Sequence, residues 1–290
     1  MHRAVTVHIV VGLAALATQA MAAEDIAAIF DDIAHLDMRR ASLTAARAVK
    51  AHPKGSPEWT TATLCLAVSL HHRQPDIKRD KEKAAALYDE LIASQVPPPA
   101  LPLAMIMRGR LADQIDYAGD TLDTATAVGL YERVMQDWPD TFFADVAIYH
   151  LTEVELSSMD AEATRVALDR LRAWLARRPN NPMAPVQWTL IGTSSFRPPL
   201  EDYAGAIEAF EKAIAIGLPE QIPLDAIYWR MGGIAEKSGT NDKAIQFYRK
   251  IITEVARSSF GFEAQLRIRA LGGDPPELID PFAETVEARP

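Results

Sequence analysis

Histidines and carboxylates are the side chains of this 290-residue chain whose types and spacing could support chemistry. His71 and His72, followed by Asp76, are ligand types that zinc accepts, and His150 lies about one helical turn from Glu153. Two or three ligands do not complete a structural zinc site. We therefore expect a solvated turn at the first group and a packed histidine at the second, with metal binding as the alternative.

Signals for a nucleophile or an acid–base pair are equally weak. Ser194 stands in the stretch Ile191 to Ser195, which is more simply explained as the continuation of a helix that begins near Trp188 than as a nucleophile turn. Neighbouring carboxylates such as Asp31 and Asp32 are typical of an acidic helix face, and no apolar pocket surrounds them in sequence. The pattern predicts no catalytic residue.

Common motifs for metal, nucleophile and phosphate chemistry do not occur in the sequence. It contains no H-E-x-x-H, G-x-S-x-G, G-x-x-x-x-G-K or G-x-G-x-x-G. Its one cysteine, Cys65, lies in an apolar stretch, so we expect it to be buried and inert, and a single thiol forms no intrachain disulfide. We predict no metal and no cofactor.

Composition describes a folded, mildly acidic protein. Hydrophobic residues make up 49% of the chain and charged residues 24%, which is enough to bury a core. Thirty Lys and Arg face 39 Asp and Glu, giving a formal charge of −9. A general nucleic-acid binder needs an excess of cations to displace phosphate counterions, so that class is excluded.

The first 22 residues resemble a secretory signal peptide. An apolar run from Ala4 to Ala17 precedes the small-x-small pattern of Ala20 and Ala22. The run is shorter than the roughly 20 residues that a spanning helix needs. We expect residues 1–22 to be cleaved, leaving a protein secreted across the inner membrane to the periplasm, with no membrane span; a retained anchor and a fully extracellular protein are the alternatives.

A repeat organises the remainder of the chain. An alanine is followed at four by an aromatic or apolar residue and at seven by a small or apolar one, which places all three on one helical stripe. The leading alanines are Ala41, Ala84, Ala127, Ala167, Ala206 and Ala244. Prolines that should stop these helices follow twelve or thirteen residues later in five copies, at Pro53, Pro97, Pro139, Pro179 and Pro219.

A second helix is predicted before each of these helices. Trp188 and Tyr228 are each followed four residues later by a glycine, Gly192 and Gly232. A glycine there lets the partner helix approach closely, at a propensity cost of about 1 kcal/mol. Weaker versions of this pattern begin at Trp59, at Ala100 and at Phe143, with alanine or threonine in the glycine position; in the copy from Ala100 this is Ala104.

These paired patterns resemble the tetratricopeptide repeat, with the Sel1-like repeats as a related alternative because the spacing exceeds 34 residues. The resemblance implies an all-α fold: a right-handed α-solenoid of about six helical hairpins, a TPR-like superhelix, over residues 23–271. A C-terminal capping helix is expected from Phe260 to Leu271. The Pro-rich tail, residues 272–290, is expected to be loosely ordered.

The resemblance also implies a binding face, formed by the first helix of each pair. Carried onto this sequence, its residues are Trp229, Gly233, Glu236 and Lys237; Thr189, Thr193, Phe196 and Arg197; and Ala144, Ile148, Leu151 and Thr152. Trp229 lies about 100° around the helix from Tyr228, so it is either a groove aromatic or a contact to the neighbouring repeat.

The expected function is that of a non-catalytic adaptor, which binds another protein or a peptide segment in a concave groove. One alternative is an enzyme, a hydrolase or a metal-dependent protein, with its site on that face. The other is a structural factor in envelope assembly. The identity of the partner and the oligomeric state do not follow from the residues.

Overall fold

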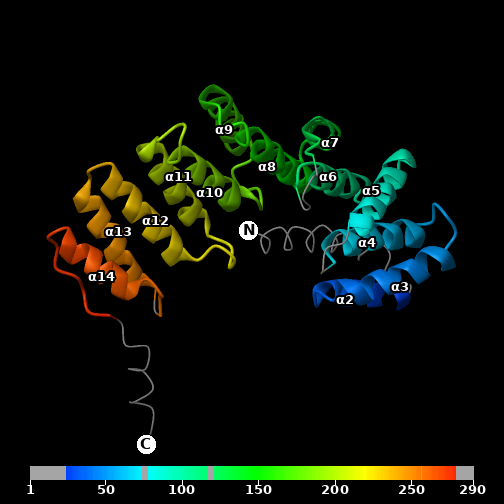
Figure 1. Ribbon diagram of the computed structural model, residues 1–290, viewed down its shortest axis with the longest axis horizontal. Helices are drawn as coiled ribbons and strands as arrows, with labels where there is room; N and C mark the ends of the chain where they lie inside the picture. The colour runs from blue at the N-terminus through cyan, green and yellow to red at the C-terminus, as the bar shows by residue number, and fades with distance from the viewer. Residues whose placement is uncertain (1–23, 74–77, 116–120, 256, 279–290) are drawn as a thin grey trace, which may run out of the picture. The chain divides into compact units, whose positions relative to one another are not determined.

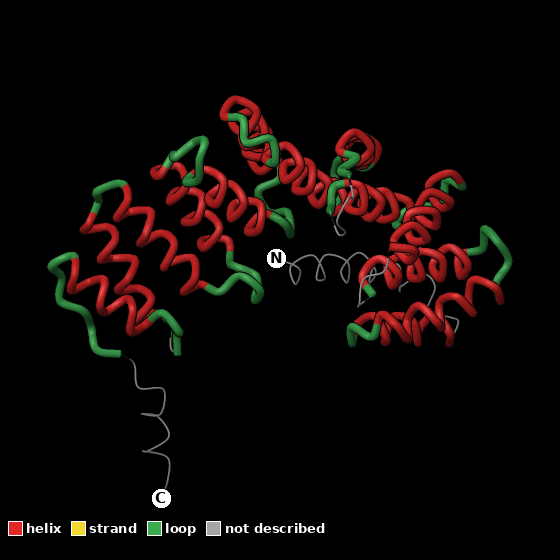
Figure 2. The backbone as a smooth tube through the Cα atoms, viewed as in Figure 1, coloured by secondary structure: helices red, strands yellow, loops and turns green. Residues whose placement is uncertain are grey.

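The described residues of the computed structural model, 24–73, 78–115, 121–255 and 257–278, contain thirteen α-helices and no strand (Figures 1 and 2). The all-α prediction is confirmed for this part of the chain. The predicted signal segment, residues 1–22, Asp76 and residues 279–290 of the tail lie outside the described residues. Residues 272–278 of the tail form no helix or strand.

The helices divide into two compact units, one ending at Ser157 and the other beginning at Ser158. In unit 1 each helix packs against the next, and α2 also packs on α4, α4 on α6 and α6 on α8. Its helices are α2 (Glu24–Ala34), α3 (Met38–Ala51), α4 (Pro57–His72), α5 (Lys78–Ala93), α6 (Ala100–Ala112), α7 (Thr124–Asp137) and α8 (Phe142–Leu156).

Unit 2 repeats the same scheme of consecutive packing. Figure 1 shows α10 to α14 side by side in chain order, and contacts join each to the next. The helices of this unit are α9 (Ala161–Arg177), α10 (Ala184–Ser195), α11 (Tyr203–Ile216), α12 (Leu224–Lys237), α13 (Asn241–Glu254) and α14 (Gly261–Ala270). Both units are therefore built as helical repeats are, from neighbours that bury one another's apolar faces.

The leading alanines and the prolines of the predicted repeat occupy the expected places in the helices. Each of the six leading alanines lies in its own helix, and each is at most 1% exposed. The five prolines follow the ends of α3, α5, α7, α9 and α11 by two to four residues. Ser194 continues α10, as expected, and α14 occupies the place predicted for a last helix.

Aspartates begin most of the helices that contain the leading alanines. Asp37, Asp123, Asp160 and Asp202 each accept a hydrogen bond from the backbone N–H three residues later, at 2.8–3.1 Å. A side-chain acceptor at this position satisfies one of the backbone donors that a helix start leaves open. Proline at the end and aspartate at the start therefore set the length of these helices.

Glycines allow close approach between helices. For the copy that begins at Ala100, the sequence pattern predicted the wrong residue for this contact. A Cβ added to Gly192 would lie 2.9 Å from the Phe210 ring, and one added to Gly232 would lie 2.5 Å from Tyr248. In the copy that begins at Ala100, the glycine facing an aromatic is Gly109, 2.6 Å from Tyr131, rather than the position of Ala104. Gly109 lies three residues before the end of α6, as Gly192 lies three residues before the end of α10, so the pattern counted from Ala100 was placed too early in the sequence.

Helix α4 departs from the amphipathic pattern. Its residues from Trp59 to His71 are all buried, because α2, α3, α5 and α6 pack around it. Cys65 in its centre is buried as predicted, and burial raises the pKa of its thiol to about 12. Within the described part of the chain, no helix combines the length and the hydrophobicity required to cross a bilayer.

Candidate functional site

The predicted binding residues of α10 lie on a partly open side of unit 2. Thr189 and Thr193 are half-buried on the helix, Phe196 is the residue at its C-terminal cap, and Arg197 beyond it is exposed. The Thr189 hydroxyl donates to the Pro185 carbonyl at 2.8 Å and is thereby satisfied within the helix. Thr193 instead contacts the next repeat, as described below.

Of the predicted residues on α12, two are engaged inside unit 2. The half-buried Trp229 ring stacks on Phe260 with centroids 5.3 Å apart and lies 5.1 Å from Tyr248, so it packs against the following helices. Glu236 accepts a 2.5 Å hydrogen bond from the Tyr248 hydroxyl and pairs with Arg267 of α14. Of the two roles weighed for Trp229, the contacts establish packing.

Gly233 and Lys237 are the open positions of α12. A Cβ added to Gly233 would meet nothing within 4 Å, and the Lys237 side chain is exposed. A residue with a side chain could occupy position 233 without an internal clash. This part of α12 is therefore accessible to a binding partner.

The predicted face does not extend to α8. Ala144, Ile148, Leu151 and Thr152 are at most 1% exposed. They are buried because α8 packs against both α6 and α7 in unit 1. The expectation that these four residues line an accessible groove was wrong.

Arg230 also belongs to this face, although the resemblance to the tetratricopeptide repeat did not predict it. It follows Trp229 on α12, is half-buried, and its Nη1 donates to the Thr193 Oγ1 of α10 at 3.1 Å. Its guanidinium carbon lies 5.9 Å from the centre of the Phe210 ring. Burial, and then the neighbouring charge of Arg197, lower the pKa of Arg230 below its ordinary value.

Among the described residues no carboxylate pairs with Arg230 or with Arg197. The Arg230 guanidinium donates to the neutral Thr193 hydroxyl, and the guanidinium of Arg197 lies over the Phe196 ring, 5.8 Å from its centre. Two like charges near each other, one of them half-buried, cost energy unless an anion compensates them. We call Thr189, Thr193, Phe196, Arg197, Trp229, Arg230, Gly233 and Lys237 the α10–α12 face.

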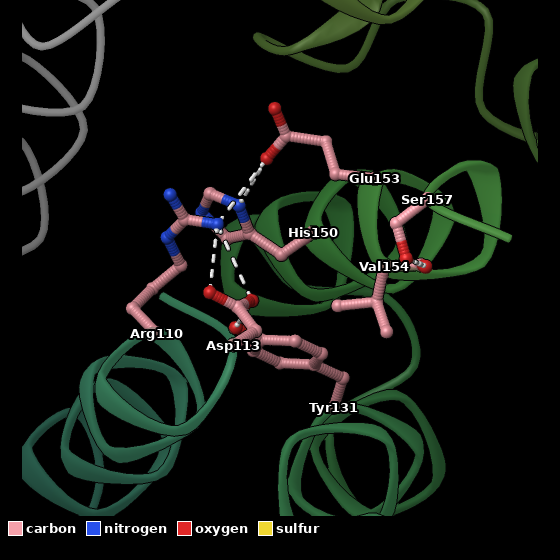
Figure 3. Close-up of polar contacts among 7 residues, drawn as sticks. All are labelled: Arg110, Asp113, Tyr131, His150, Glu153, Val154 and Ser157. Carbon is pink, nitrogen blue, oxygen red and sulfur yellow. Dashed lines mark hydrogen bonds and ion pairs between the residues drawn. The ribbon is translucent and has the colours of Figure 1, made fainter. Parts of the chain in front are cut away.

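A second group of interest is a polar cluster in unit 1 (Figure 3). Arg110, near the end of α6, lies 3.2 Å from an oxygen of Asp113 and 3.4 Å from Glu153 of α8. The Tyr131 hydroxyl of α7 donates to Asp113 at 2.7 Å, and His150 Nδ1 donates to Glu153 at 2.9 Å. The polar cluster thus joins three consecutive helices.

Burial and charge shift the titration of the polar cluster. Burial raises the pKa of Asp113 to about 6, against the opposing effects of Arg110 and the Tyr131 hydrogen bond. For Glu153 burial also acts upward, but the hydrogen bond and charge of His150 together with Arg110 outweigh it and lower the pKa. Burial likewise raises the pKa of Tyr131 well above its ordinary value. Asp113 is thus a carboxyl that gains and loses its proton near neutral pH.

The histidines for which metal binding was the alternative lie in two environments. His150 is 2% exposed and packs beside Tyr131, with ring centroids 5.8 Å apart, as expected of a packed histidine. His71 is also buried, in the last turn of α4, and its ring stacks on His72 at 4.3 Å, so the expected solvated turn was wrong. The described residues hold no group of three histidine, cysteine or carboxylate ligands that could bind a metal ion.

Comparison with known proteins adds no assignment. No protein-family model matches the chain, and no curated protein matches it with significance. The two sites above are therefore interpreted from their geometry alone.

Proposed function

We propose that this protein is a non-catalytic adaptor that binds an acidic segment of another protein on the α10–α12 face. The observation that carries the proposal is the half-buried Arg230, which lies beside Arg197 and has a hydroxyl, not a carboxylate, as its partner. A guanidinium presents five N–H donors in a fixed fork that matches a carboxylate. A glutamate or aspartate of a partner would complete the site.

The rest of the proposal follows the repeat pattern. Consecutive packing of helices in both units supports a TPR-like or Sel1-like solenoid, which we take to be right-handed and closed by α14. The apolar run and small-residue pattern of residues 1–22 support secretion, and we place the mature protein in the periplasm.

The test compares matched peptides on an array of 15-residue sequences, in which each peptide carrying two glutamates is paired with the same peptide carrying glutamines. We expect the best glutamate peptides to bind about tenfold more tightly than their glutamine pairs, since a charge-assisted hydrogen bond is worth about 1.5–3 kcal/mol. Arg230→Gln should remove this preference. Gly233→Phe should block binding of both peptides, because the added ring fills open space on the face.

Arg165→Gln is the matched control. It removes one arginine from an exposed position of α9 in the same unit, where the side chain pairs with the exposed Glu162. Its binding should equal that of the parent. Equal affinity for glutamate and glutamine peptides, or a preference that survives Arg230→Gln, would refute the proposal.

An enzymatic function at the polar cluster is the second candidate, and the raised pKa of Asp113 is the observation that favours it. Against it, the side chains of Asp113 and His150 are each only 3% exposed, and both already have partners inside the cluster. The polar cluster is better explained as a network that holds α6, α7 and α8 together. A hydrolase screen in which Asp113→Asn abolishes turnover of a folded protein would favour the enzyme instead.

A further inference from the structure

A hollow of about 410 Å³ opens on unit 1, between α3, α4 and α5. Its apolar wall consists of Leu43 and Ala46 from α3 with Leu66 and Leu70 from α4. Leu43 is 55% exposed, so the hollow presents apolar surface to solvent. The volume lies within the range of about 300–1,000 Å³ that is typical of small-molecule sites.

Charged side chains also line the hollow. They are Arg73, the C-cap residue of α4, and Arg79, Asp80 and Lys83 of α5. Arg73 pairs with Asp80, so that carboxylate is already neutralised. Arg79 and Lys83 lie one turn apart on the same side of α5, and within the described parts of the chain neither pairs with a carboxylate.

The hollow thus combines cationic side chains of α5 with apolar side chains of α3 and α4. A ligand that fits carries an anionic head, to face Arg79 and Lys83, and an apolar tail, to cover the exposed Leu43 and the half-buried Ala46. A peptide segment would present polar backbone along its whole length to the apolar wall, where nothing satisfies it. We propose that this hollow binds a single-chain amphiphilic anion, of the fatty-acid carboxylate class.

This site is independent of the α10–α12 face, because every residue that lines it belongs to unit 1. The proposal therefore stands or fails separately from the proposed adaptor function. It assigns to the protein a small-molecule ligand in addition to its protein partner.

Isothermal titration of the full chain with laurate, below its micellar concentration, tests the proposal. We expect one laurate to bind per chain. Dodecyltrimethylammonium, which has the same chain with a cationic head, and acetate, which has the head without the chain, should each bind at least tenfold more weakly. The double variant Arg79→Gln/Lys83→Gln should weaken laurate binding about tenfold, through loss of two charge-assisted contacts.

Two further variants separate the site from general adsorption. Ala46→Trp fills the hollow without a change of charge and should abolish binding. Lys50→Gln/Lys78→Gln removes two exposed lysines from α3 and α5 that do not line the hollow, and it should bind like the parent. Unchanged laurate affinity in the Arg79→Gln/Lys83→Gln variant, equal binding of the cationic amphiphile, or no binding of laurate would each overturn the proposal. Displacement of laurate by an acidic peptide would assign the hollow to a protein partner instead.

Discussion

Two half-buried arginines of this protein differ in how their charge is compensated. Arg110 lies between Asp113 and Glu153, and its pKa is raised because these carboxylates outweigh the effect of burial. Arg230 donates to the neutral Thr193 hydroxyl, has no carboxylate partner among the described residues, and its pKa is lowered by burial and by Arg197. A buried charge needs a partner. We therefore interpret the first arginine as structural and the second as part of a binding site.

The adjacent glycines 232 and 233 give a matched pair of predictions. Gly233→Ala should raise the free energy of unfolding by about 0.5–1 kcal/mol, because alanine has the better helix propensity and its Cβ meets nothing. Gly232→Ala should lower it by about 1–3 kcal/mol, because the Cβ would lie 2.5 Å from Tyr248. Urea unfolding of both variants measures the difference. Equal effects at the two positions would contradict the close contact of Gly232 in α12 with Tyr248 in α13.

Asp113 predicts a pH dependence of stability. Burial raises its folded-state pKa to about 6, above the 3.8 of an ordinary aspartate, so the folded protein holds this proton more tightly than the unfolded chain does. Its contribution to stability is therefore greatest below about pH 4 and falls as the pH rises through 6. Relative to Asp113→Asn, the parent should lose about 1–3 kcal/mol of unfolding free energy between pH 4 and pH 7.5.

The comparison with the variant is needed because other groups titrate in the same range. Burial, with the neighbouring charges of His72, Lys81 and Arg110, lowers the pKa of His71 well below 6.5, so this histidine destabilises the fold as the pH falls. The groups that face Asp113 are Arg110, Tyr131 and Glu153, and they are the same in parent and variant. Urea unfolding at several pH values gives the difference; a difference independent of pH would contradict the raised pKa.

Individual helices are bounded by signals that act over a few residues. Pro139 and Pro179 follow the ends of α7 and α9 by two residues, as predicted from the missing amide hydrogen of proline. Asp123 and Asp160 cap the starts of the same helices, and an aspartate just before a helix is itself a start signal that a sequence shows. Both devices are local, so a single sequence reveals them.

Removal of one helix cap should lower the free energy of unfolding by a measurable amount. Asp160 accepts the Ala163 N–H at 2.8 Å, and Asp160→Ala should lower the free energy of unfolding by about 1 kcal/mol, since the first turn of α9 then loses an acceptor. Asp160→Asn keeps an acceptor at the same place and should lie within a few tenths of a kcal/mol of the parent. An equal loss in both variants, measured by urea unfolding, would show that the negative charge and not the hydrogen bond matters.

At the scale of the whole molecule, each unit owes its stability to contacts between neighbouring helices. A substitution in one helix should therefore destabilise that helix and its neighbours, and leave distant helices unaffected. In Gly232→Ala we expect faster hydrogen exchange in α11 to α14, and unchanged exchange in α2 to α4, measured by mass spectrometry of peptides. The matched unit 1 variant is Gly109→Ala, whose Cβ would meet Tyr131 at 2.6 Å. In this variant we expect faster hydrogen exchange in the helices of unit 1 and unchanged exchange in α11 to α14. A uniform change along the chain would instead indicate a single cooperative unit.

The residues alone determine that this chain forms pairs of helices, because buried alanines, bounding prolines and close-approach glycines act through backbone geometry and through partners a few turns away. The contact of Gly109 with Tyr131, and the burial of Ile148 and Leu151, depend on which helices pack against α6 and α8. The contact of Arg230 with Thr193, 37 residues apart, and the lining of the unit 1 hollow likewise combine residues of separate helices. Only tertiary packing decides such contacts, because a side chain's charge partner and exposure are properties of its neighbours in space.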